Sequence, residues 1–151
     1  LKLAANIGAM LIAFISILSM INFTLEYFFS VKLQEILGII FSPLAWTMGI
    51  PWEEADIVGR LMGEKIVLTE LIAYGSLGDL IKNNLISERS AIISSYALCG
   101  FANFGSIGIQ LGGIGSMAPE RRNVLSKIVF KAMIGGALAS WLTATIAGIL
   151  I

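Results

Sequence analysis

Charged residues are missing from three long stretches of the chain. These stretches cover residues 3–25, 90–119 and 132–151. A helix that crosses a bilayer needs roughly 20 consecutive apolar residues, and each stretch is that long. In a soluble domain about a quarter of the residues are charged and interleaved with apolar ones, whereas 13% of this chain is charged and 57% is hydrophobic. The pattern predicts an all-α membrane protein.

Residues 1–50 predict a scaffold of two helices. One long helix over 3–29 spans the membrane, and its Asn6 and Asn22 suit helix packing as well as any function. Residues 30–45 are charged only at their start, which suits a helix that lies in the membrane interface. We expect neither helix to carry the site itself.

Residues 51–81 predict a re-entrant helical hairpin. Pro51 suits the first turn of a helix, and Gly63 is expected to interrupt that helix about three turns later. A second helix begins after Thr69, whose side chain suits an N-cap. Each half is too short to cross a bilayer. The pair would therefore enter and leave on one side, with a non-helical tip that is buried in protein or lines a wet cavity.

Glu70 stands near the predicted tip, among apolar residues. An ionisable side chain that faces lipid at such depth costs roughly 2.5 to more than 10 kcal/mol, so we expect Glu70 to face a polar pathway or a partner. The alternative is that Glu70 is neutral, or is paired with Lys65 as a structural contact. Arg60 and Lys65 are themselves expected on a water-accessible side of the hairpin or at its tip.

Residues 89–118 predict a broken helix. A continuous helix over 90–119 would be about 45 Å long, and a bilayer core is only about 30 Å thick. The segment FANFGS puts the most polar groups near the middle, where a broken helix exposes backbone groups that a substrate or ion can use. Asn103 and Ser106 share a helical face and offer an amide and a hydroxyl. Phe101 joins them only if the stretch is unwound.

Helix packing is the structural alternative for this segment. Gly108 and Gly112 are four residues apart, a spacing that lets helices approach closely, and Asn or Ser can hydrogen-bond a neighbouring helix. We favour packing for Gly108, Gly112 and Gly115, and a binding site for Asn103 and Ser106. The last helix, over 120–151, has a face of small residues, and we expect it to support the site without touching substrate.

Composition excludes several functions. The formal net charge is zero and the basic residues are scattered, so the chain has no electrostatic footprint for nucleic acid. Histidine is absent and Cys99 is the single cysteine, so metal-assisted and histidine-based catalysis are poorly supported. Leu1 and Lys2 lead into a hydrophobic helix without a cleavable signal pattern. We take the chain to be a fragment.

Two segments resemble a known family. GEKIVLTELIAY, residues 63–74, resembles the Gly-x-Lys-x-x-x-Asn-Glu-Phe-Val-Ala-aromatic signature of the concentrative nucleoside transporters. SYALCGFANFGSIGIQLGGIGSMAPERR, residues 95–122, looks like the C-terminal signature of that family nearly residue for residue. The resemblance implies one half of an inverted-repeat transporter, with a scaffold over 1–50 and the C-terminal part of the transport domain over 51–151.

The resemblance also implies a function and a site. The expected function is nucleoside import by sodium- or proton-driven symport, in a homotrimer with an elevator-like moving transport domain in a plasma membrane such as a bacterial inner membrane. Glu70 and Asn103 would bind the ribose hydroxyls, with Ser106 beside them and Phe101 near the base. Half of the cavity would come from outside this chain. The base preference and the coupling ion stay open, and no metal or cofactor is expected on this fragment.

Three positions depart from the family pattern. Thr69 replaces the usual Asn, Leu71 the usual Phe, and Gly105 stands where many members have Ser; these changes would tune base preference or hairpin opening. Two other functional classes stay open. One is a membrane module that recognises or gates nucleosides without transporting them. The other is an intramembrane enzyme, which would need a nucleophile and a base within reach; we predict that the protein is not an enzyme.

Overall fold

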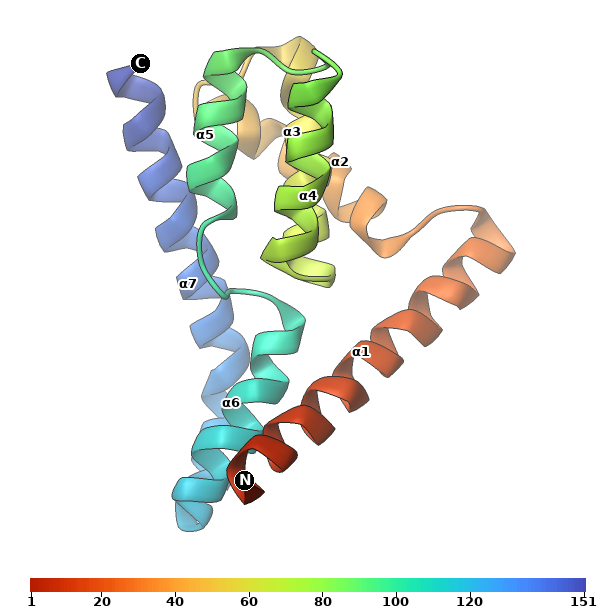
Figure 1. Ribbon diagram of the computed structural model, residues 1–151, viewed down its shortest axis with the longest axis vertical. Helices are drawn as coiled ribbons and strands as arrows, with labels where there is room; N and C mark the ends of the chain where they lie inside the picture. The colour runs from red at the N-terminus through yellow and green to blue at the C-terminus, as the bar shows by residue number, and fades with distance from the viewer.

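All regular secondary structure of the chain is helical, as predicted. The computed structural model describes residues 1–151 (Figure 1). The helices are α1 (Lys2–Phe29), α2 (Leu33–Thr47), α3 (Trp52–Val67), α4 (Glu70–Lys82), α5 (Glu88–Leu98), α6 (Phe104–Met117), the short 3-10 helix η1 (Pro119–Arg121) and α7 (Arg122–Leu150).

Two segments are long and apolar enough to cross a membrane. They are α1 and the continuous segment Pro119–Leu150, which contains α7. The charge-free stretch over residues 90–119 forms α5 and α6 instead of one continuous helix. In Figure 1, α7 runs along the whole height of the molecule, while α1 leaves it obliquely, with its N-terminal end near α6. Only 6% of the apolar window of α1 is buried within the chain, so most of this helix is exposed on its surface.

The contact between α1 and α6 depends on glycine. A Cβ atom added to Gly108 would lie 3.0 Å from the carbonyl oxygen of Met10, and one added to Gly112 would lie 3.1 Å from Cγ of Met10. Such distances leave no room for a larger side chain at either position. The packing role predicted for these two glycines is confirmed, whereas the atoms nearest to a Cβ added to Gly115 belong to the side chain of Arg122.

Helices α3 and α4 form the predicted hairpin, which turns at Leu68 and Thr69. The hydroxyl of Thr69 accepts a hydrogen bond from the backbone N–H of Ile72 at 3.4 Å, as expected of an N-cap. The expected interruption at Gly63 is wrong, because α3 continues through this residue to Val67. The absence of a side chain at Gly63 has another reason: it lets the carbonyl of Gln34 in α2 approach the helix. Re-entry of the hairpin into a membrane stays a prediction.

Helix α2 lies along α3 in a close glycine-mediated contact. A Cβ atom added to Gly59 would lie 2.5 Å from the carbonyl oxygen of Gly38 and 2.8 Å from the amide nitrogen of Ser42. Gly38 is also buried, with an added Cβ 3.1 Å from Cα of Arg60. The two backbones are therefore nearly in contact, and α2 and α3 form one packed unit. Placement of α2 at a membrane interface stays a prediction.

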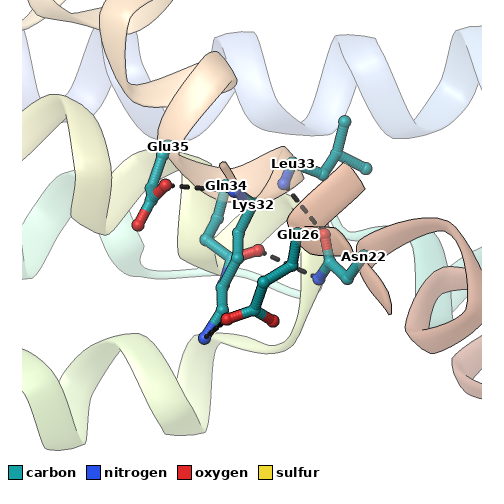
Figure 2. Close-up of polar contacts among 6 residues, drawn as sticks. All are labelled: Asn22, Glu26, Lys32, Leu33, Gln34 and Glu35. Atoms are coloured by element: carbon teal, nitrogen blue, oxygen red, sulfur yellow. Dashed lines mark hydrogen bonds and ion pairs between the residues drawn. The ribbon is translucent and has the colours of Figure 1, made fainter. Parts of the chain in front are cut away.

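Asn22 connects α1 to the start of α2 (Figure 2). Its Nδ2 donates to Oε1 of Gln34 at 3.1 Å, and its Oδ1 accepts from the backbone N–H of Leu33 at 2.8 Å. An ion pair between Lys32 and Glu26 at 3.6 Å lies beside them. The sequence left open whether Asn22 serves helix packing or a function, and in the structure it holds α1 against the start of α2.

Gly59→Ala should destabilise the protein, because the added methyl group would overlap the backbone of α2. Overpacking of this kind costs about 1–3 kcal/mol, which we expect to see as a lower melting temperature of the full-length protein in detergent. Gly135→Ala is the control, because no atom lies within 4 Å of an added Cβ there. Equal melting temperatures for the two variants would contradict a tight contact between α2 and α3.

Candidate functional site

The site begins with the break between α5 and α6. Helix α5 ends at Leu98 and α6 starts at Phe104, so residues 99–103 are not helical. Gly100 has a φ of 117°, a conformation that glycine adopts without the strain of a side chain. The predicted break at FANFGS is confirmed. Four C-terminal carbonyl groups of α5 and four N-terminal amides of α6 now lack partners within their own helices.

On the α6 side of the break, Asn103 binds an exposed backbone amide. It is the N-cap of α6: its Oδ1 accepts from the backbone N–H of Ser106 at 2.7 Å, and its own N–H donates to Oγ of Ser106 at 3.3 Å. This reciprocal pair is a capping box. Asn103 is only 3% exposed. Because Oδ1 is engaged in the cap, only the Nδ2 group of Asn103 remains to reach another element.

The hairpin tip supplies the partner of that amide. Nδ2 of Asn103 donates to Oε2 of Glu70 at 2.9 Å. Glu70 is the first residue of α4, so its carboxylate lies at the positive end of that helix dipole, and Asn103 lies at the positive end of α6. The structure therefore brings the two residues together as predicted. The alternative pairing of Glu70 with Lys65 is wrong, because no ion pair joins them.

On the α5 side of the break, three side chains from three helices bind the exposed carbonyl groups. Each donates a hydrogen bond to a backbone carbonyl at the end of α5: Tyr74 Oη to Ser95 at 2.6 Å, Lys65 Nζ to Ala97 at 3.0 Å, and Ser140 Oγ to Cys99 at 2.6 Å.

Lys65 does not lie where the sequence suggested. Its side chain is fully buried at 0% exposure, so the predicted water-accessible position is wrong. The unpaired carbonyls at the negative end of α5 attract the ammonium group inward. Arg60 meets the expectation: its side chain is 62% exposed and forms an ion pair with Asp56 at 3.0 Å.

Ser106 and Phe101 occupy different environments. Ser106 is 4% exposed, and its hydroxyl donates to the carbonyl of Asn103 at 2.6 Å, so within this chain it braces the cap. Phe101 lies in the unwound segment but is 72% exposed, so its ring faces out of the chain. The structure thus places Ser106 against Asn103 and leaves Phe101 free to contact something beyond these residues.

The main cavity of the chain lies elsewhere. It has a volume of about 640 Å³, lies between the start of α2 and the helices α3 and α4, and is lined by charged residues that include Asp56, Arg60 and Glu64. None of the predicted site residues lines it, or the cavities of about 530 and 360 Å³. The pair Glu70 and Asn103 therefore lies outside these three cavities.

Sequence reasoning missed Lys65, Tyr74 and Ser140 as parts of this arrangement. A signal exists for Tyr74, which follows Glu70 by four residues and so shares its helical face. Lys65 is a charge close to the turn of the hairpin, and such a residue is expensive within a membrane unless it has a partner. Ser140 has no comparable signal in the sequence, because its role depends on how α7 crosses the break.

The family can be decided by comparison with known proteins. Residues 1–148 match the family described as the C-terminus of the Na+ dependent nucleoside transporters. The chain belongs to this family. It is 44% identical to the uncharacterized transporter YutK of Bacillus subtilis over 100% of the chain and 38% of that protein. It is 39% identical to the nucleoside permease NupC of Helicobacter pylori over 100% of the chain and 38% of the permease.

A mammalian relative and solved structures of the family agree. Sodium/nucleoside cotransporter 1 of Mus musculus is 41% identical over 99% of the chain and 26% of its own length. A CNTnw variant in an outward-facing state is 40% identical, with a TM-score of 0.92 over 99% of this chain and 39% of that one. Substrate-bound, inward-facing CNTnw is 42% identical, with a TM-score of 0.77 over 96% and 37%. The chain therefore spans less than half of these relatives.

Tyr74→Phe should weaken the attachment of α4 to the end of α5, because it removes the hydrogen bond to the Ser95 carbonyl. The loss of one such bond costs about 0.5–1.5 kcal/mol, and thermal unfolding of the full-length protein should report it as a lower melting temperature. Tyr96→Phe is the matched control, since Tyr96 is 45% exposed and its hydroxyl makes no hydrogen bond within the chain. A melting temperature unchanged by Tyr74→Phe would show that this capping bond does not stabilise the break.

Proposed function

We propose that the intact protein imports nucleosides across the plasma membrane by ion-coupled symport, and that this chain supplies one wall of the substrate site. The observation that carries the proposal is the hydrogen bond of 2.9 Å between Asn103 and Glu70. It joins the hairpin tip to a helix break, and broken helices commonly form the substrate site of a secondary transporter. Two of the relatives are named nucleoside transporters, which supports the substrate class.

The chemistry of the pair suits a ribose. A carboxylate can accept two hydrogen bonds from neighbouring hydroxyl groups, and its bonds to such donors are shorter and stronger than neutral ones. Oε2 of Glu70 already accepts from Asn103, while its Oε1 accepts no hydrogen bond within the chain. The Asn103 amide adds a donor beside that oxygen. One sugar hydroxyl would donate to Oε1, and a second would accept from Nδ2 or donate to Oε2.

Ser106 and Phe101 take supporting roles in this proposal. Ser106 holds the Asn103 side chain in its cap and so fixes the direction of the Nδ2 group that donates to Glu70. Phe101 offers an exposed ring within the unwound segment, and an aromatic face suits a flat nucleobase. The remaining walls of the site would come from parts of the protein beyond these residues.

An elevator-like movement is supported by the contact between α1 and α6. Glycines form this contact, and no side-chain hydrogen bond joins the two helices, so no directional bond opposes sliding. The TM-score also falls from 0.92 with an outward-facing CNTnw variant to 0.77 with inward-facing CNTnw. A homotrimer, and sodium or a proton as the coupling ion, complete the proposal; the name of the matched family supports sodium.

Glu70→Gln and Asn103→Ala, each introduced into the full-length protein, should abolish uptake of uridine or adenosine in proteoliposomes. Loss of one hydrogen bond to a charged group costs about 1.5–3 kcal/mol, which corresponds to roughly 10- to 150-fold in affinity. A panel of nucleosides, run once with a sodium gradient and once with a proton gradient, identifies the base preference and the coupling ion. Wild-type uptake by either variant would remove that residue from the site.

Controls separate binding from folding. Asn103→Ser keeps a side chain that can cap α6 but is too short to reach Glu70, so it should retain stability and lose uptake. Glu53→Gln and Asn123→Ala change an exposed acid and an exposed amide away from the break and should transport normally. If the wild-type protein binds nucleosides but moves none across the membrane, it is a recognition or gate module instead of a transporter.

A further inference from the structure

Lys65 is the one fully buried charged side chain of the chain. It lies in α3, three residues before the hairpin turns. No carboxylate lies within ion-pair distance of its ammonium group. Its hydrogen-bond partner within the chain is the carbonyl oxygen of Ala97 at 3.0 Å. An ammonium group in such a place is costly unless something else compensates its charge.

The end of α5 provides that compensation. Aligned peptide dipoles give a helix C-terminus about half a negative charge, concentrated on its last unpaired carbonyls. Ala97 is the residue before the last of α5, and its carbonyl is one of these groups. In transporters, the C-terminal ends of half-helices and unwound carbonyls are places that coordinate a sodium ion or a proton. Here a side chain of the protein already lies on such a carbonyl.

Glu70 makes the opposite contact on the other side of the same break. The two residues flank the hairpin turn, Lys65 in α3 and Glu70 at the start of α4. The ammonium contacts the carbonyl end of α5, and the carboxylate contacts Asn103 at the amide end of α6. The hairpin tip thus carries two opposite charges, and each faces the helix end whose dipole it complements.

We propose that Lys65 is a tethered cation, which holds the place at the end of α5 that a free cation would otherwise occupy. It is a positioning residue: it aligns the broken helix with the hairpin tip so that Glu70 and Asn103 stay within hydrogen-bond distance. Because Lys65 occupies this place, the break between α5 and α6 binds no free cation. This proposal rests on the proposed function only in using nucleoside binding as its readout.

Lys65→Ala tests the proposal by chemical rescue. The substitution leaves a methyl group and removes three carbons and the ammonium, a volume that matches propylammonium. We expect nucleoside affinity of the full-length protein, measured by calorimetry in detergent, to fall by roughly 10- to 100-fold, the equivalent of losing one charged hydrogen bond. Propylammonium should restore much of this affinity and should raise the melting temperature, whereas 1-propanol should do neither. Lys65→Met, which fills the space without charge, should bind weakly with either additive.

Several controls make the outcome decisive. Arg60→Ala removes an exposed charge from the same helix and should bind nucleoside normally with and without propylammonium. If Lys65→Ala cannot be purified in plain buffer, recovery of assembled protein with propylammonium but not with 1-propanol supports the proposal, and no recovery overturns it. Wild-type affinity in Lys65→Met, or equal effects of the amine and the alcohol, would also overturn it. Failure of the wild-type protein to bind nucleosides would instead count against the proposed function.

Discussion

The interruption of one helix near its middle is the constraint on which the other features of this chain depend. A broken helix exposes backbone amides and carbonyls, and within a membrane no water is available to satisfy them. In the structure, side chains form hydrogen bonds with these groups on both sides of the break. Asn103 and Ser106 cap the start of α6, while Lys65, Tyr74 and Ser140 donate to the carbonyls that end α5. These donors come from α3, α4 and α7, so the break also fixes how those helices pack.

Much of this arrangement could be predicted from the sequence, because its strongest signals are local. Charge-free windows reveal helices that can lie in a bilayer, and a cluster of polar residues and glycines inside one of them reveals the break. Thr69 was placed correctly because a capping side chain acts on the turn that follows it, whereas the capping role of Asn103 was not predicted. The resemblance to the family implied that Glu70 and Asn103 lie at one site, while the cost of a carboxylate at depth required only that Glu70 have a polar partner.

The failures concern features that depend on tertiary packing. Gly63 has a weak helical preference in isolation, but the close approach of α2 decides its conformation and keeps it within α3. Lys65 is buried because the end of α5 lies beside it, a fact that local sequence does not contain.

The glycines on α6 have a mechanical consequence. Gly108 and Gly112 are separated by about one turn, or close to 5.4–6 Å along the helix axis, and both rest against α1 around Met10. A shift of α6 by one turn would bring one glycine to the place the other had left, so the surface of α1 would meet nearly the same shape again. Two helices with such a repeat can pack equally well in several positions, which differ by a displacement of one helical turn along the helix axis.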